Sequence, residues 1–197
     1  MSTTTLTRRG SIVDQFIPAT LITNVLLVVV GAAFVGALAQ ISWTVPGLPA
    51  PFTGQTLGVL VVGGTLGARR AVSAMALYAV AGLAGMPWFA AQTHGWNAGT
   101  KPLFGYIIGF MVAGVVMGYL SNKGTDRTVS GAIGMFVLGE LAIYAVGVTW
   151  LSLDLHHTLS WGITYGMVPY LVWDIAKAVV AGSLLPLAWR LLPDQNS

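Results

Sequence analysis

The sequence predicts an all-α membrane protein with six transmembrane helices in one bundle and both termini in the cytoplasm. Hydrophobic residues make up 55% of the 197-residue chain and charged residues only 8%, whereas about a quarter of the residues in a typical soluble domain are charged. No charged side chain occurs between Asp14 and Arg69, a stretch longer than one transmembrane helix requires. Residues 1–197 are therefore predicted to form a single transmembrane domain.

The first three predicted spans differ in length. Leu21–Ile41 is a long apolar run that ends where Pro and Gly become frequent. Gln55–Leu66 is short, because at about 1.5 Å per residue it would cover roughly 18 Å of a hydrocarbon core about 30 Å thick. Val72–Ala91 follows two arginines and ends before the polar segment QTHGWN.

The last three predicted spans are separated by polar turns. Pro102–Leu120 ends before SNKGTDR, and Ala132–Leu151 ends before SLDLHH. Ile163–Leu187 is the last apolar run, and residues 188–197 are left as a tail. Apolar windows of this length bounded by polar breaks are typical of transmembrane helices.

The distribution of basic residues predicts the orientation. With six spans, both termini share one side of the membrane with the second–third and fourth–fifth connections. That side collects the bases Arg8, Arg9, Arg69, Arg70, Lys123, Arg127 and Arg190, whereas Lys101 lies on the other side. The excess of positive charge places residues 1–16 and 188–197 in the cytoplasm.

The segment 42–56 is predicted to be an outer loop. It contains TVPGLPAPFTGQT (Thr44–Thr56), which is rich in Pro and Gly and carries no charge. Such a segment can dip to membrane depth only where protein or a watery cavity covers its backbone. The loop is therefore a candidate lid or cavity wall.

Three ionisable residues fall inside predicted spans, namely Glu140, Asp174 and Lys177. Charges in the membrane are costly and usually face the bundle interior. Asp174 and Lys177 are three residues apart and share one helical face, as do Glu140 and Tyr144, which are four apart. Three interpretations stay open: an ion pair in which Asp174 or Glu140 neutralises Lys177, a polar ligand site, and a proton relay through Glu140 and Asp174.

The first predicted span also has small-xxx-small patterns, among them Ala33 and Ala37. Small residues at this spacing let helices approach closely in lipid. Packing within the bundle and docking to another subunit explain the pattern equally well.

Several functional classes have no support in the sequence. The chain has no cysteine, which excludes disulfides and thiolate metal sites, and its scattered bases do not form a nucleic-acid-binding patch. GGTLGARR lacks the preceding strand and the lysine of a phosphate-binding loop. His156 and His157 are adjacent and do not share a helical face, so we expect a solvated loop there. We therefore predict no enzyme activity, no metal site, no cofactor and no nucleic-acid partner.

Several motifs in order resemble the signature of the BioY family. The first is PFTGQTLGVLVVGGTLGARRAVSAMALYAVAGLAGMPWFA, residues 51–90. FGYIIGF (Phe104–Phe110) and IYAVGVTWL (Ile143–Leu151) continue the resemblance, and GMVPYLVWDIAKA (Gly166–Ala178) completes it. The match therefore runs from the first loop to the last helix.

The resemblance implies a six-helix subunit that binds biotin with high affinity, the S component of a bacterial energy-coupling-factor (ECF) transporter in the cell membrane. Its implied partners, besides biotin and membrane lipid, are an EcfT-type transmembrane coupling protein and two cytoplasmic ATPases that hydrolyse ATP. Some family members are thought to work without them. In such transporters the small-residue face of the first helix docks the coupling protein, which implies a docking role for Ala33 and Ala37.

The same resemblance implies which residues bind the ligand. Biotin's ureido ring has two N–H donors and one carbonyl acceptor, which suit Asp174 and Lys177. Its apolar ring and chain require apolar and aromatic walls. The further candidates are Phe52, Thr53, Gln55, Phe89, Asn97, Tyr106 and Tyr144.

The chain departs from the family pattern in three places. Gly54 stands where the family usually has Leu, and GTKPLFGY (Gly99–Tyr106) replaces GPTGGY, which makes Lys101 a candidate for the biotin carboxylate by its charge. Glu140 lies outside the pattern and can compensate Lys177. The alternatives are an S component for riboflavin or thiamine, which would suit a site without the Asp174–Lys177 pair, and a proton-coupled carrier.

Overall fold

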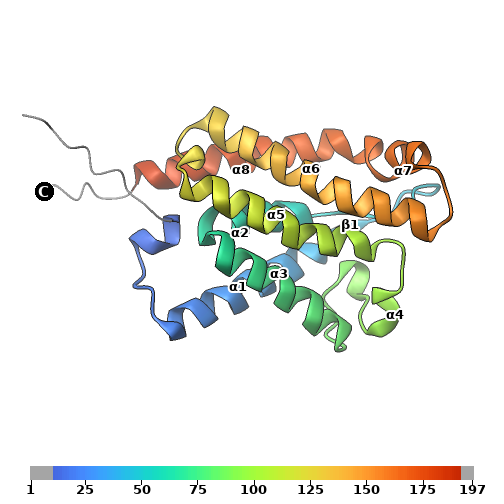
Figure 1. Cartoon of the computed structure of the whole chain (residues 1–197), viewed down its shortest axis with the longest axis horizontal. Coiled ribbons are helices and arrows are strands. Elements are labelled where there is room, and N and C mark those ends of the chain that lie inside the picture. Colours follow the sequence, from blue (N-terminus) through green and yellow to red (C-terminus); the bar gives the residue numbers. More distant parts are fainter. Residues whose placement is uncertain (1–10, 192–197) are drawn as a thin grey trace, which may run out of the picture.

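The computed structural model describes residues 11–191, and in this part of the chain long helices pack side by side, with one short pair of strands toward one end of the bundle (Figure 1). Its α-helices are α1 (Leu21–Ala39), α2 (Gln55–Leu66), α3 (Ala68–Leu83), α4 (Trp96–Gly99), α5 (Phe104–Asn122), α6 (Val129–Asp154), α7 (Leu159–Gly166) and α8 (Leu171–Arg190). Short 3-10 turns are η1 (Ile12–Gln15), η2 (Ala90–Gln92), η3 (Thr125–Arg127) and η4 (Val168–Tyr170), and the strands are β1 (Ser42–Trp43) and β2 (Phe52–Thr53).

The predicted all-α membrane fold is confirmed. Within residues 11–191, four helical segments are long and apolar enough to cross a membrane: α1, α5, α6 and the stretch Leu159–Arg190. The chain is therefore a multi-pass membrane protein. Because α2 has 12 residues and α3 has 16, the count of six spans stays a prediction. The predicted terminal segments 1–16 and 188–197 lie partly outside the described residues. Arg8 and Arg9 lie wholly outside them.

The third helix ends earlier than predicted. The sequence predicts a span over Val72–Ala91, but α3 ends at Leu83. Gly85 has φ +114, a conformation that favours glycine, and Pro87 lacks an N–H for a helical hydrogen bond. The chain after α3 therefore turns back, and Phe89 packs over the face of Gly82, where a Cβ would meet the Phe89 ring at 2.1 Å.

The sixth predicted helix, Ile163–Leu187, is broken in the structure. α7 ends at Gly166 and α8 starts at Leu171, with the turn η4 between them. Pro169 lies in this turn, where its ring and its missing N–H disfavour a continuous helix. The break turns Tyr170 inward and sets Asp174 in the first turn of α8.

The short helix α2 contacts α1, α3, α5 and α8 and lies in the middle of the bundle. Its glycines let these neighbours approach: a Cβ on Gly63 would lie 2.7 Å from the Met117 side chain, and one on Gly64 would lie 2.7 Å from Leu185. Close packing in membranes depends on such small residues. As a result the first turn of α2 is held inside the bundle.

The two ends of the bundle differ in charge. One end, here called the basic end, is formed by the α2–α3 junction, the α5–α6 turn and the last turn of α8 (left in Figure 1). It carries Arg69, Arg70, Lys123, Arg127 and Arg190. The opposite end, which contains α4, α7 and the loop between β1 and β2, is the cavity end (Figure 1).

Candidate ligand-binding site

A cavity of about 320 Å³ lies at the cavity end of the bundle. Its walls come from β2 and the loop before it, the first turn of α2, η2 and α4, the first half of α5, the middle of α6, and the α7–α8 break. Its volume is within the range of pockets that hold small molecules, about 300–1,000 Å³. Segments far apart in the sequence thus build one site.

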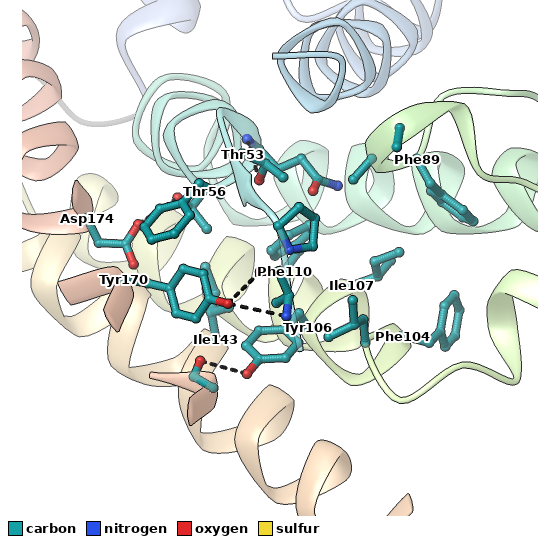
Figure 2. A pocket seen from close by; sticks show the side chains of 18 of the residues that line it. Thr53, Thr56, Phe89, Phe104, Tyr106, Ile107, Phe110, Ile143, Tyr170 and Asp174 are labelled. Atoms are coloured by element: carbon teal, nitrogen blue, oxygen red, sulfur yellow. Dashed lines mark hydrogen bonds between the residues drawn. The ribbon is translucent and has the colours of Figure 1, made fainter. Parts of the chain in front are cut away.

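The loop 42–56 forms one wall of the cavity. β1 and β2 pair antiparallel, with Trp43 opposite Phe52, and residues 50–53 line the cavity. Tyr170 fixes the loop, because its hydroxyl donates to the Ala50 carbonyl at 2.5 Å and accepts from the Ala50 N–H at 3.2 Å (Figure 2). A Cβ on Gly54 would lie 2.8 Å from the Leu38 carbonyl oxygen, so a leucine at this position would require the end of α1 or the loop to shift.

A buried polar network closes one side of the cavity. Asp174 and Lys177 are 6% and 7% exposed, and Lys177 Nζ lies 2.6 Å from Asp174 Oδ1. Lys177 also donates to Thr56 Oγ1 at 2.5 Å and to the Thr53 carbonyl at 3.2 Å. Asp174 accepts from Thr56 Oγ1 at 3.3 Å and, through its other oxygen, from the Tyr144 hydroxyl. The network therefore joins α2, α6 and α8.

Glu140 lies beside this network on α6. It lines the cavity and is 6% exposed. Lys177 makes its ion pair with Asp174, and both Glu140 carboxyl oxygens lack a hydrogen-bond partner among residues 11–191. Of the two acids, Asp174 is therefore the direct ion-pair partner of Lys177, and Glu140 interacts with Lys177 electrostatically.

Aromatic side chains form most of the remaining wall. On one side Phe52 packs against Tyr170, with ring centroids 4.7 Å apart, and stacks on Trp43 at 5.4 Å. Across the cavity Phe89 and Phe104 meet edge to face at 6.4 Å (Figure 2). Aromatic walls with a few fixed polar groups are typical of pockets for small organic ligands.

Two predicted residues support the wall as well as line it. Tyr106 donates from its hydroxyl to the Gly166 carbonyl at 2.8 Å, which ties α5 to the end of α7 (Figure 2). Gln55 donates from its side-chain amide to the Tyr78 hydroxyl at 2.7 Å. Both side chains therefore present a surface to the cavity while their polar ends hold neighbouring helices.

The structure brings eight of the predicted ligand residues to the cavity: Phe52, Thr53, Gln55, Phe89, Tyr106, Tyr144, Asp174 and Lys177. Asn97 does not line the cavity. It lies on an exposed face of the four-residue helix α4, whose Ala98 lines the cavity instead. Lys101 lines the cavity and is itself exposed, so it lies at the rim.

The sequence reasoning missed Thr56, Tyr170, Trp173, Phe104, Phe110 and Ile143, which also line the cavity. Two signals could have found some of them. Thr56 is adjacent to Gln55 in the quoted PFTGQT segment, and Tyr170 precedes Asp174 by four residues, the spacing of one helical turn.

Ala33 and Ala37 lie on the outer face of α1. Both are exposed, whereas Ala32, Val35 and Gly36 are buried against the bundle. Packing within this bundle therefore uses the other face of α1, and the Ala33–Ala37 face is open on the outside of the molecule.

A model of the BioY family matches residues 6–194. The chain belongs to the BioY family. Among its relatives, the biotin transporter BioY of Rhizobium etli is 30% identical over 159 residues, covering 74% of this chain and 83% of that protein. The biotin transporter BioY of Thermotoga maritima is 34% identical over 138 residues, covering 70% of this chain and 80% of that protein.

A solved structure shares the fold of this BioY family member. It is the S-component for biotin from an ECF-type ABC transporter, with a TM-score of 0.79 at 19% sequence identity. The similarity covers 89% of this chain and 95% of that chain. The helical arrangement therefore belongs to a known fold.

Proposed function

We propose that this chain binds biotin in the cavity and serves as the S component of a bacterial ECF-type biotin transporter. The observation that carries the proposal is the Lys177–Asp174 network at one side of an aromatic cavity of about 320 Å³. The family assignment and the relatives named biotin transporters support the same ligand. The chain is then a substrate-binding subunit rather than an enzyme.

The cavity suits the parts of biotin in a definite order. The polar ureido ring lies at the network side, where Asp174 and its neighbours supply hydrogen-bonding groups. The apolar ring and chain run along the aromatic wall of Phe52, Phe89 and Tyr106. The carboxylate then reaches the rim, where Lys101 offers a positive charge.

The partners follow from the outer surface of the molecule. The exposed Ala33–Ala37 face of α1 is the proposed docking surface for an EcfT-type coupling protein, because small residues allow a second helix to approach closely. Two cytoplasmic ATPases would then supply the energy, and membrane lipid would cover the remaining apolar surface, including the outward Leu21, Ile22 and Val172.

The proposed topology has six spans, with α1, α2, α3, α5, α6 and the α7–α8 stretch each crossing the membrane. The basic end, with Arg69, Arg70, Lys123, Arg127 and Arg190, faces the cytoplasm by the positive-inside rule. Residues 1–16 and 188–197 are then cytoplasmic, residues 42–56 form the outer lid, and residues 1–197 form a single domain.

Calorimetric titration of the purified protein with biotin in detergent tests the proposal. We expect saturable tight binding to one site, and weak or no binding of riboflavin and thiamine. If the folded protein binds riboflavin or thiamine but not biotin, the ligand is that vitamin and the biotin proposal is wrong. Biotin uptake in cells that stops when the proton gradient is removed, and is unaffected by loss of the ATPases, would favour a proton-coupled carrier instead.

A further inference from the structure

The hydrogen-bonding capacity of the polar network is nearly used up within the protein. A lysine ammonium has three N–H donors, and those of Lys177 go to Asp174, Thr56 and the Thr53 carbonyl. Asp174 accepts from Lys177 and Thr56 at one oxygen and from Tyr144 at the other. Lys177 therefore has no donor left for a ligand unless one of these bonds breaks.

Glu140 is the opposite case in the same cavity wall. It is 6% exposed, and both carboxyl oxygens lack a partner among residues 11–191. A buried polar group without a hydrogen bond is costly, and proteins rarely retain one without a reason. Since Glu140 lines the cavity, a ligand that carries an N–H group can supply the missing partner.

The position of Glu140 directs it to the polar part of a ligand. It is one helical turn before Tyr144 on α6, and Tyr144 donates to Asp174. Glu140 also interacts electrostatically with Asp174 and Lys177 and lies near the Thr56 side chain, without the geometry of a hydrogen bond. It is therefore at the network side of the cavity rather than at the aromatic wall or the rim.

We propose that Glu140 accepts a hydrogen bond from a ureido N–H of bound biotin, beside the Asp174–Lys177 pair. The proposal rests on biotin being the ligand. Protonated or ionised, a carboxyl group keeps an oxygen that accepts. Glu140 thus contributes to specificity for a ligand with an N–H group.

A double-mutant cycle between protein and ligand tests this role. The protein change is Glu140→Met, which keeps an unbranched side chain of similar length and removes both acceptors. The ligand change replaces one or the other ureido N–H by CH₂, giving two analogues. Calorimetry gives the dissociation constant for each combination, and the cycle isolates the Glu140–N–H interaction from general damage to the site.

We expect one analogue to bind the wild-type protein about 10- to 100-fold more weakly than biotin, as for loss of a hydrogen bond to a charged or strongly polar group. Glu140→Met should bind biotin itself about 10- to 100-fold more weakly than the wild type does. For this variant, the dissociation constants of biotin and of the same analogue should differ by less than about threefold. The proposal would be overturned if replacing biotin by the analogue weakened binding equally in the wild type and in Glu140→Met. It would also be overturned if Glu140→Met bound biotin as tightly as the wild type does.

The control variant is Leu141→Ala, one residue away on α6. Leu141 is 49% exposed on the outside of the bundle, so we expect the dissociation constant for biotin and both analogues to stay at the wild-type values. A change as large as that of Glu140→Met would mean that any substitution in this part of α6 disturbs the cavity, and it would count against the proposal.

A spectroscopic measurement decides the matter if Glu140→Met does not fold. Infrared difference spectra with and without biotin should contain a shifted carboxyl band in the wild-type protein that is missing in Glu140→Gln, which keeps the size and one acceptor. The absence of such a band in the wild-type protein would overturn the role of Glu140. Failure of the folded wild-type protein to bind biotin would instead reject the proposed function.

Discussion

The two ends of the bundle bury a carboxylate in different ways. At the cavity end, Asp174 is compensated by the Lys177 ammonium 2.6 Å away. At the basic end, Asp126 is completely buried between α5 and α6. Its carboxyl group accepts a hydrogen bond from Trp189 Nε1 at 2.7 Å and forms another with Ser121 Oγ at 3.0 Å. The cavity end thus uses an ion pair around an open volume, whereas the basic end uses neutral donors in a packed corner.

The hydrogen-bond pattern of the basic end favours a protonated Asp126. Ser121 Oγ lies 2.8 Å from the Gly64 carbonyl as well as 3.0 Å from Asp126, but a hydroxyl has only one proton to donate. If Asp126 donates from Oδ2 to Ser121, Ser121 can donate to Gly64, which satisfies the one-proton limit of the hydroxyl; Asp126 Oδ1 has no hydrogen-bond partner among residues 11–191. In agreement, burial raises the pKa of Asp126 above its ordinary value, although bonds from Trp189 and Ser121 act to lower it.

The difference between the ends has a functional meaning. Packing at the basic end joins α2, α5 and α8 through Gly64, Ser121 and Trp189, so it stabilises the fold. The cavity end holds charges around empty space, which is costly for stability alone and is typical of a site that binds a ligand. Substitutions at the two ends should therefore separate stability from binding.

Lys177→Met should have the largest effect, and it should reduce both stability and binding. Removing one member of a buried ion pair leaves Asp174 uncompensated, which costs about 3–5 kcal/mol. Because the wall around Asp174 then rearranges, we expect biotin affinity to fall at least about a hundredfold. Calorimetry and thermal unfolding in detergent measure the two effects.

The double variant Asp174→Asn with Lys177→Met is the control for this prediction. It removes both charges, so most of the lost stability should return, whereas binding should stay weak because the wall is altered. If the double variant does not regain stability, the Asp174–Lys177 pair stabilises the fold by more than charge compensation. If Lys177→Met binds biotin normally, the cavity end resembles the basic end and is purely structural.

Gly118→Ala should have a smaller effect, confined to stability. A Cβ at residue 118 of α5 would lie 2.1 Å from the Ala68 nitrogen and 2.3 Å from the Ala68 Cα, and backbone atoms cannot move aside easily. We expect a loss of about 1–3 kcal/mol, as for other overpacked positions. The biotin dissociation constant of the folded fraction should be unchanged, since this contact is at the α2–α3 junction of the basic end.

Gly134→Ala is the matched control. A Cβ at Gly134 of α6 meets nothing within 4 Å, so the same chemical change should be neutral or stabilise the helix by about 0.5–1 kcal/mol. Equal thermal unfolding of the two variants would contradict the view that the basic end is closely packed, and a loss of biotin affinity in Gly118→Ala would show that the ends are coupled.

The sequence predicts the helices better than it predicts the cavity. The helix Gln55–Leu66 was predicted with the bounds that α2 has, because Pro/Gly-rich and basic segments flank it. The early end of α3 and the break before α8 were missed, since apolar periodicity continues through both. The reversal at Gly85 and the turn at Pro169 depend on single residues whose effect on the chain direction appears only in the fold.

Most of the site residues that the quoted motifs indicated lie together at the cavity, and so does Lys101, which was indicated by its charge. The i,i+3 spacing of Asp174 and Lys177 predicted a shared face and is confirmed by their contact. Asn97 does not line the cavity, because the direction in which each residue of α4 faces depends on the turn at Gly95, which precedes α4 and has φ +78. The choice between Asp174 and Glu140 as partner of Lys177 also required coordinates, since both are acidic and both are in spans.

The smallest predicted effect is the pH dependence of stability that Asp126 contributes. Burial raises the folded-state pKa of Asp126 above its ordinary value of 3.8. In a pH range that begins near 3.8, Asp126 therefore stays protonated in the folded protein while it ionises in the unfolded chain. The stability from this group is complete below the window and is lost as the pH rises through it, at no more than about 1.4 kcal/mol per pH unit.

Asp126→Asn removes the ionisation and keeps an oxygen for Trp189, so its unfolding temperature should depend less on pH between 4 and 8 than that of the wild type. Asp14 does not confuse the comparison. Burial raises the pKa of Asp14, but hydrogen bonds from Ser11 and Arg70 together outweigh this effect and lower the pKa. The stability that Asp14 contributes to the folded protein is therefore lost only as the pH falls below about 3.8. Equal slopes for the wild type and Asp126→Asn would mean that Asp126 titrates as in the unfolded chain, and the contrast between the two ends would then rest on packing alone.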